Sequence, residues 1–320
     1  MTVILLAITS ASKKKETRAH FLEEGLSDLE RDLAKVYEAI AKTAQSVSRQ
    51  FPFRLGMTKT LNPFGEQQAE LDVFSNEMFS KALLDTARVG WVASEEMSTP
   101  LGGYSQTQDF LAVALDPIDG SSNIRTNNPL GSIFGIWRGG LLKKGKDLVG
   151  AAFVTYGPML TITLAANDSV NQYVELNEGD GSGKFAVADK EMKLPQKPEV
   201  YGFGGPRAEW IPPVERFVSQ LETRGMHLRY GGTLIGDYNN VLQRGGIFSY
   251  PALKGKPEGK LRICYETAPV SYLNELAGGR SSNGEISILD IEPKDLTQRS
   301  AFYVGNASLI QNLEHEIAAK

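Results

Sequence analysis

The chain has 320 residues, of which 41% are hydrophobic and 22% are charged, and its formal net charge at pH 7 is −4. This composition is typical of a folded globular protein with a sizeable core, and the length favours two domains or one large two-lobed domain. The negative charge argues against general binding to nucleic acid or to an anionic membrane, so an anionic ligand must be held by local basic groups or by metal ions.

The first residues, MTVILLAITSAS, resemble the apolar part of a secretion signal. No basic residue precedes them, however, and Lys13, Lys14 and Lys15 follow them instead. No other apolar run approaches the ~20 residues that a membrane helix needs. The sequence therefore predicts a cytoplasmic protein with neither a nucleic acid nor a membrane as partner.

In the first half of the chain, apolar residues at helical spacing predict helices over residues 26–47 and 72–87. Two short apolar strands are predicted at 90–93 and 111–115, and each ends directly before acidic residues. Residues 130–176 alternate apolar and β-branched types between Gly and Pro, which favours antiparallel strands.

A segment rich in Gly, Asp and Lys at 176–199 suggests a boundary between an N-terminal lobe (1–195) and a C-terminal lobe (196–320). In the second lobe strands and helices alternate. The predicted strands are 200–203, 246–250, 260–265 and 301–304, and the predicted helices are 213–223, 234–243, one ending at 277–279 and one beginning at Ser308. This mixture favours an α/β or α+β fold in layers of helices and sheets.

Two acidic motifs carry the most information, SEEM at Ser94–Met97 and DPIDGSSN at Asp116–Asn123, and each follows an apolar strand. Adjacent carboxylates repel each other, and a divalent cation offsets that repulsion. Carboxylate and carbonyl oxygens suit Mg²⁺ better than zinc. Pro117 stiffens the second motif so that Asp116 and Asp119 can converge on one site.

The residues after Asp119 add a second signal. Gly120, Ser121 and Ser122 offer backbone N–H groups that can hold a phosphate oxygen. A capped turn is the structural alternative, because Asp, Pro, Gly and Ser are all common in loops. The upstream Glu95-Glu96 pair favours the functional interpretation, which is metal-assisted transfer of a phosphoryl group to water.

Four segments in chain order, ASEE, LDPIDGSSNI, GSIFGIWR and GKLRICYE, together resemble the class I fructose-1,6-bisphosphatase family. This family belongs to the lithium-sensitive phosphatases, which include the inositol monophosphatases. The resemblance covers roughly residues 60–306. It implies a layered αβαβα sandwich and usually a homotetramer. It also implies a requirement for about two or three Mg²⁺ ions per subunit, with Mn²⁺ as a possible substitute.

The resemblance assigns roles to particular residues. The implied metal ligands are Glu95, Glu96, Asp116, Asp119, Glu266 and the main-chain carbonyl of Ile118. NPFGEQQAELDV resembles the family's mobile catalytic loop, whose acidic residues are here Glu66 and Asp72. Glu96 and Asp72 can orient and deprotonate the attacking water, and the first phosphate would contact Gly120, Ser121 and Ser122.

A second group of residues bears on the substrate. In the family their positions hold a distal phosphate, with the arginine reaching in from a neighbouring subunit, and here they are Arg229, Tyr230, Tyr250, Lys260 and Arg262. Each alone could equally be a packing residue, a solvated charge or an ion-pair partner. Together they favour a sugar bisphosphate over a monophosphate.

The chain also departs from the family. Gly202–Arg207 replaces the usual N-E-G-Y segment, and Arg207 could supply a substitute cation. This segment resembles sedoheptulose-1,7-bisphosphatase, whereas the context of Tyr250 resembles the fructose enzyme. Arg125 stands where an acidic residue is common, and the sequence offers no explanation for it. Fructose 1,6-bisphosphate is the expected substrate, with the seven-carbon sugar as the alternative or a second activity. An inositol-type monophosphatase or a non-catalytic sensor is less favoured.

Two features concern regulation. Relatives are often inhibited by AMP through a Lys-Tyr pair just before the DPxDG strand, but Phe110 and Leu111 stand there in this chain, so AMP insensitivity is expected. The single cysteine, Cys264, rules out an intrachain disulfide. Its apolar neighbours indicate a buried side chain and not a nucleophile.

Overall fold

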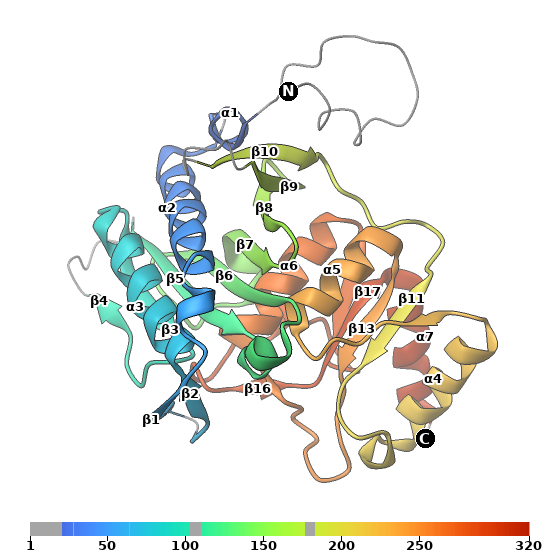
Figure 1. Cartoon of the computed structure of the whole chain (residues 1–320). Helices are drawn as coiled ribbons and strands as arrows, with labels where there is room; N and C mark the ends of the chain where they lie inside the picture. Colours follow the sequence, from blue (N-terminus) through green and yellow to red (C-terminus); the bar gives the residue numbers. More distant parts are fainter. Residues whose placement is uncertain (1–20, 28, 64, 103–109, 177–182, 320) are drawn as a thin grey trace, which may run out of the picture.

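The computed structural model describes residues 21–319, apart from residues 28, 64, 103–109 and 177–182. The apolar run at the start of the chain and part of the predicted boundary segment lie outside the described residues. Figure 1 shows two large sheets with helices around and between them. In the described part of the chain, no helix is both long and apolar enough to cross a membrane.

The first sheet has eight strands in the order β10-β9-β8-β7-β6-β5-β3-β4. Its strands are β3 (Val89–Ser94), β4 (Leu101–Gly102), β5 (Leu111–Asp119), β6 (Leu130–Arg138), β7 (Leu148–Tyr156), β8 (Leu160–Ala166), β9 (Ser169–Leu176) and β10 (Lys184–Asp189). Only β3 and β5 run parallel to each other. The antiparallel strands predicted for residues 130–176 are therefore confirmed as β6 to β9.

The segment predicted to separate the lobes contributes the edge strand β10 to this sheet. Phe185 of β10 is buried and joins the same apolar core as Leu22. The Gly, Asp and Lys residues around it do not favour a strand, but burial of Phe185 against the sheet outweighs that local preference.

The second sheet has five strands in the order β12-β11-β13-β17-β15. Its strands are β11 (Val200–Phe203), β12 (His227–Leu228), β13 (Gly246–Tyr250), β15 (Gly279–Ser282) and β17 (Phe302–Asn306). Two short ladders complete the strands, β1 (Met57–Leu61) with β2 (Gln67–Ala69), and β14 (Leu261–Arg262) with β16 (Arg299–Ser300).

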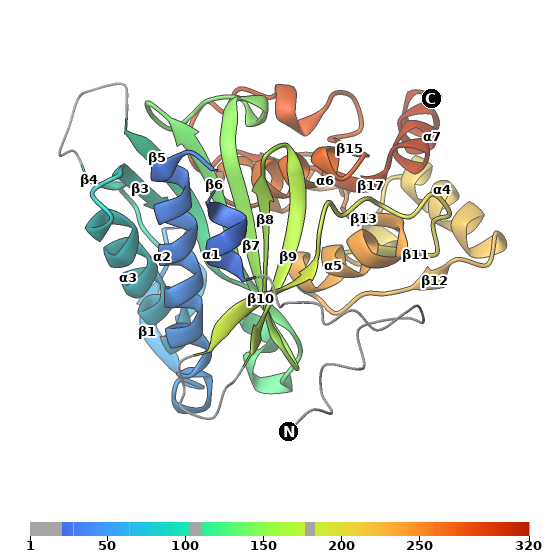
Figure 2. The same ribbon diagram turned by 90° about the horizontal axis from the view of Figure 1, so that it is seen from above.

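The helices form three layers around these sheets, as Figure 2 shows from above. One outer layer consists of α1 (Leu22–Leu26), α2 (Arg31–Ser48) and α3 (Glu70–Asp85), which pack on the first sheet. Between the sheets lie α5 (Leu234–Arg244) and α6 (Ala268–Leu276). The other outer layer, on the second sheet, consists of α4 (Pro212–Thr223) and α7 (Ala307–Ala318). The order of layers is αβαβα, as expected.

Burial on both faces explains the continuous apolar run of β5. Leu111, Val113 and Leu115 join the core beneath α2 and α3. Ala114 faces the other way and packs with Trp137 and the residues that follow β14. Every residue of β5 is buried, so the strand shows no polar alternation until its acidic end.

Two predicted elements need correction. The strand expected at 260–265 ends at Arg262, and residues Ile263–Thr267 form a π-helical turn that leads into α6. A short apolar run cannot distinguish a strand from a buried helical turn by its periodicity. The first long helix begins at Arg31 and not at 26, because Leu26 ends the separate short helix α1.

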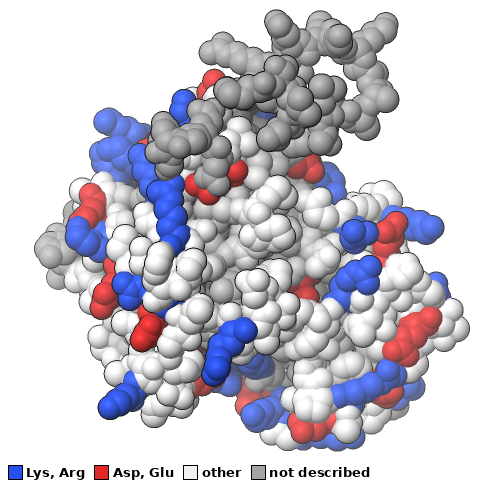
Figure 3. All heavy atoms as spheres, in the orientation of Figure 1, with Lys and Arg blue, Asp and Glu red and all other residues white. Residues whose placement is uncertain are grey.

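Neither sign of charge dominates the face of the molecule drawn in Figure 3. On the face drawn in Figure 3, Lys and Arg side chains are interspersed with Asp and Glu side chains. The acidic residues of the two motifs are largely withdrawn from this surface, since Glu95, Asp116 and Asp119 are all buried.

Candidate active site

A bulge in β5 decides which way the acidic side chains face. The ladder between β5 and β6 passes from Asp116 directly to Asp119, so that Pro117 and Ile118 lie opposite the single residue Ser132. In a regular strand, side chains three positions apart point to opposite faces. Because the bulge adds one residue to β5, the side chains of Asp116 and Asp119 point to the same side. Both line one cavity of about 230 Å³.

Three buried carboxylates converge in this cavity, which we call the acidic cavity. Glu95 follows β3, Asp116 belongs to β5 and Glu266 comes from the π-helical turn. One oxygen of each lies within 4.8 Å of the others. Burial raises the pKa of all three carboxyls, and repulsion by neighbouring carboxylates raises it further. A group of buried like charges requires positive charge to offset it.

Asp119 connects the acidic cavity to the second half of the chain. Its two carboxylate oxygens accept hydrogen bonds from the amides of Leu234 at 3.1 Å and Ile235 at 2.6 Å. These amides belong to the first turn of α5, where N–H groups lack partners within the helix. The start of α5 therefore fixes the orientation of Asp119.

Arg262, which the sequence-based prediction placed at the distal phosphate, lies among the carboxylates of the acidic cavity. Its guanidinium donates a short hydrogen bond to Glu95 and another to Glu66 at 3.3 Å. It also lies 3.8 Å from the Glu266 carboxylate. The side chain is only 4% exposed, so its charge offsets the acidic cluster.

Glu96 and Asp72 lie beside this cluster on the side of α3. Glu96 accepts a hydrogen bond from the Gln68 side chain at 2.6 Å, and Asp72 accepts one from the Ala69 amide at 2.8 Å. Burial, followed by repulsion from Glu96, raises the pKa of Asp72 to about 7. Burial also raises the pKa of Glu96. Asp72 can therefore accept a proton near neutral pH, and Glu96 takes up a proton more readily than a free carboxylate does.

Glu66 behaves differently, although it lines the same cavity. It lies between β1 and β2, where the Asn62 side chain donates to its carboxylate at 3.2 Å. Although partial burial opposes the shift, this hydrogen bond and the charge of Arg262 lower the pKa of Glu66. Glu66 therefore remains ionised where Asp72 and Glu96 take up protons more easily.

The turn after Asp119 needs glycine for two reasons. Gly120 has a φ of +80°, and a Cβ atom there would lie 1.9 Å from the methyl carbon of Thr233. Ser121 and Ser122 follow it at the start of a short helical segment. All three residues line the acidic cavity next to the carboxylates, as the sequence predicted.

A second cavity, of about 300 Å³, adjoins the acidic cavity, and Tyr250 and Lys260 line both. We call it the distal cavity. Tyr230 also lines it, with its ring centre 6.5 Å from that of Tyr250. The glycine segment explains part of its shape, because a Cβ atom on Gly204 would lie 2.5 Å from the Tyr250 ring.

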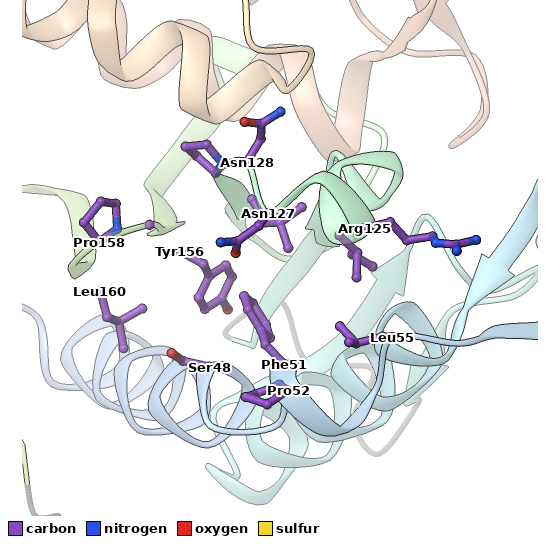
Figure 4. Close-up of a pocket in the computed structure, with 14 residues that line it drawn as sticks. Ser48, Phe51, Pro52, Leu55, Arg125, Asn127, Asn128, Tyr156, Pro158 and Leu160 are labelled. Atoms are coloured by element: carbon purple, nitrogen blue, oxygen red, sulfur yellow. The ribbon is translucent and has the colours of Figure 1, made fainter.

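Three sequence candidates lie elsewhere. Arg207 does not line the distal cavity, because its guanidinium binds Glu215 and Glu222. Its expected role as a substitute cation stays a prediction. The exposed Arg229 donates to the carbonyl of Leu228 and lines neither cavity of its own subunit. Arg125 lines a separate, larger cavity, shown in Figure 4.

Other polar residues of the site were missed. Gln68 and Asn62 hold Glu96 and Glu66, and Lys256 and Arg299 line the distal cavity. None of these residues belongs to a motif. The hairpin of β1 and β2, the loop after β13 and the short strand β16 bring them to the site. Cys264 is buried as expected, and burial raises the pKa of its thiol to about 12.

The residues present fit a divalent metal. The three converging carboxylates, Asp119 and the carbonyl of Ile118 provide only oxygen ligands, and no sulfur or imidazole lines this cavity. Such a set suits Mg²⁺ or Mn²⁺. Together with the amide-rich turn and the basic distal cavity, this set defines a metal-dependent phosphatase site on a layered αβαβα fold.

Comparison with known protein families agrees with this assignment of the site. The chain matches the N-terminal domain of fructose-1-6-bisphosphatase over residues 6–189 and its C-terminal domain over residues 194–318. The chain belongs to the fructose-1,6-bisphosphatase family.

Individual relatives cover nearly the whole chain. A class 1 fructose-1,6-bisphosphatase of Haloarcula marismortui is 38% identical over 92% of this chain and 98% of its own length. The class 1 protein of Geobacter sulfurreducens is 38% identical over 78% of this chain and 80% of its own length. The structure of Leishmania major fructose-1,6-bisphosphatase in holo form superposes with a TM-score of 0.87. That comparison covers 95% of this chain and 100% of the other, at 28% identity.

Proposed function

We propose that this protein hydrolyses the 1-phosphate of fructose 1,6-bisphosphate to give fructose 6-phosphate. The observation that carries the proposal is the pair of adjoining cavities that share Tyr250 and Lys260. One cavity is acidic and suits a metal with a phosphoryl group, whereas the other is basic and suits a phosphate that is not hydrolysed. Family membership and the names of the relatives support the same substrate.

The residues of the acidic cavity suggest how the reaction proceeds. The amides of Gly120, Ser121 and Ser122 would hold the oxygens of the reacting phosphate. Bound Mg²⁺ would neutralise phosphoryl charge and make water a stronger nucleophile. Asp72 or Glu96 would take one proton of the attacking water as its oxygen bonds to phosphorus. The sugar oxygen would take a proton from water as its bond to phosphorus breaks.

The metal set that we propose is Mg²⁺, about two or three ions per subunit, with Mn²⁺ able to replace it. Its ligands would be Glu95, Glu96, Asp116, Asp119, Glu266 and the carbonyl of Ile118. Arg262 would then lose its place as the main counter-charge and turn toward the incoming phosphate. The acidic character of the cavity supports this assignment, since each ion added lowers the repulsion that burial has concentrated there.

The distal phosphate would be held by Tyr230, Tyr250 and Lys260, with Arg229 contributed by a second subunit of a homotetramer. The exposed position of Arg229 supports a role outside its own subunit. Sedimentation of the wild-type protein and of Arg229→Ala would test the assembly apart from the catalytic role. A cytoplasmic location, expected from the sequence, stays a prediction.

The seven-carbon analogue, sedoheptulose 1,7-bisphosphate, is a second candidate. The distal cavity supports it, because Gly204 and Gly205 line it without side chains and Lys256 and Arg299 add two cations to its lining. Phosphate release should be measured from both bisphosphates, from fructose 1-phosphate and from inositol 1-phosphate, with Mg²⁺ and with EDTA. Release that is fastest from inositol phosphate would favour a monophosphatase, and release from none of them would favour a sensor.

A further inference from the structure

At the bulge in β5, a main-chain carbonyl of the metal-binding turn accepts a hydrogen bond from a side chain. Pro117 lies opposite Ser132, within the stretch where the register of β5 and β6 shifts. The hydroxyl of Ser132 donates to the Pro117 carbonyl oxygen at 2.6 Å. Pro117 stands between Asp116 and Ile118, so this hydrogen bond holds the middle of the metal-binding turn.

Ser132 is itself held by a tyrosine from the next strand. Its hydroxyl oxygen lies 2.9 Å from the Tyr156 hydroxyl. A serine hydroxyl has a single proton, and that proton is engaged by Pro117, so Tyr156 must be the donor to Ser132. The two hydroxyls and the carbonyl therefore form a directed chain from β7 through β6 to the bulge in β5.

Both side chains are withdrawn from solvent, since Ser132 is fully buried and Tyr156 is 5% exposed. The ring of Tyr156 meets that of Phe51 edge to face, with 4.9 Å between centres. Figure 4 shows these two rings side by side in a cavity of about 890 Å³. Packing is incomplete on that side, so the hydrogen bond to Ser132 contributes to fixing the tyrosine.

We propose that Ser132 and Tyr156 are positioning residues of the metal site. They line no part of the acidic cavity and touch neither metal nor substrate. Their role is to fix the Pro117 carbonyl, and with it the bulge that turns Asp116, the Ile118 carbonyl and Asp119 toward one point. The proposal rests on the proposed metal-dependent function, and its test separates the two.

The test is Mn²⁺ binding to the full-length protein, followed by the loss of the free-ion electron paramagnetic resonance signal, together with thermal unfolding. Ser132→Ala removes both hydrogen bonds and should weaken Mn²⁺ binding about tenfold or more, the scale seen when an outer partner of a metal ligand is lost. Tyr156→Phe keeps the ring and the Ser132–Pro117 bond, so a loss of about threefold is expected. Ser132→Thr keeps the hydroxyl and should bind nearly as wild type.

Tyr37→Phe is the matched control. Tyr37 is also buried, and its hydroxyl donates to the Ala165 carbonyl at 2.8 Å, away from the acidic cavity. It should lose thermal stability much as Tyr156→Phe does, with unchanged Mn²⁺ affinity. Because the two bonds act in series, the double variant S132A/Y156F should bind Mn²⁺ no more weakly than Ser132→Ala alone.

Mn²⁺ affinities within twofold of wild type in both Tyr156→Phe and Ser132→Ala, with stability lost as in the control, would overturn the proposal and leave a purely structural role. If Ser132→Ala does not fold, the Mn²⁺ affinities of Tyr156→Phe and Tyr37→Phe still decide between a positioning role and a purely structural one. Absence of Mn²⁺ binding in the wild-type protein would instead refute the proposed metal-dependent function.

Discussion

The ammonium group of Lys260 lies 5.2 Å from the centre of the Tyr250 ring, where the acidic and distal cavities meet. The negative face of an aromatic ring attracts a cation without neutralising it. Lys260 is therefore oriented while its charge stays available to a phosphate, and this arrangement joins the two halves of the proposed substrate site.

Replacing Lys260 tests the distal site. Lys260→Ala should raise KM for a sugar bisphosphate by about one to two orders of magnitude, because a charge-assisted hydrogen bond is lost. Turnover of a monophosphate without the distal group should hardly change. Lys254→Ala is the control, since Lys254 lies in the same loop but outside both cavities. An equal loss on both substrates would give Lys260 a structural role.

Glu96→Gln should lower kcat by about 10² or more, because the amide cannot accept a proton from the attacking water. The hydrogen bond from Gln68 can be made to the amide oxygen, so the fold should remain intact. Circular dichroism and thermal unfolding would check the fold beside steady-state kinetics. Turnover close to wild type at saturating Mg²⁺ would remove Glu96 from the water-activating role.

Asp116→Asn should act mainly through the metal. The substitution keeps the shape of a buried side chain but removes one of the three converging charges. The Mg²⁺ concentration for half-maximal activity should rise by about tenfold or more, with a smaller change of kcat at saturation. If the Mg²⁺ dependence were that of the wild type, Asp116 would not be a ligand.

The pH dependence of stability should change with metal. Burial raises the pKa of Glu266 to about 7, so the folded, metal-free protein holds a proton that the unfolded chain releases. Its contribution to stability is complete below the ordinary carboxyl pKa and is lost as pH rises to about 7. Added Mg²⁺ binds the ionised form, and the rise in Tm that it causes should be larger at about pH 7.5 than at about pH 5.5.

Thermal unfolding with Mg²⁺ and with EDTA at these two pH values checks this prediction. Glu266→Gln should flatten the pH dependence, because the titrating group is gone. An Mg²⁺ effect of the same size at both pH values would show that the acidic cavity does not take up protons in its place.

AMP should not inhibit the enzyme through the region before β5. Leu111 is fully buried and Phe110 is partly buried, so neither can bind a phosphate dianion, whose burial without a partner would cost several kcal/mol. Arg138 nearby is already engaged with Glu30. Activity against AMP concentration is the measurement, and half-inhibition at micromolar AMP would contradict it. Reducing agents should also have no effect, since Cys264 is the single cysteine.

Much of the fold could be predicted because its elements are long and periodic. The alternation in 130–176 and the apolar stripe of α2 each show which face of the element is buried. The local preference of these segments therefore agrees with their place in the fold. The π-helical turn at Ile263–Thr267 could not be foreseen. Its short apolar run fits a strand equally well, and the Glu266 carboxylate, which accepts a hydrogen bond from the Arg262 amide at 2.6 Å, gives no periodic signal.

The site, like the fold, has parts that could be predicted from the sequence and parts that could not. Glu95, Asp116 and Gly120 belong to short motifs whose spacing itself implies convergence. The partners of Arg262 and Arg207 could not be predicted, because an arginine near a phosphate site can bind either a ligand or a neighbouring carboxylate, and only the fold shows which carboxylates lie within reach. The bulge that aligns Asp116 with Asp119 is likewise set by the pairing of β5 with β6, which no local pattern states.

The hydrogen bonds from Leu234 and Ile235 to Asp119 have a consequence for the assembly of the chain. A chain cut between residues 189 and 194 would give one fragment with Glu95, Asp116 and Asp119 and another with Glu266 and the amides that orient Asp119. Neither fragment would hold the full set of ligands. A divalent metal would therefore bind ligands from both fragments and hold them together. Reassociation of the two fragments would depend on the metal concentration.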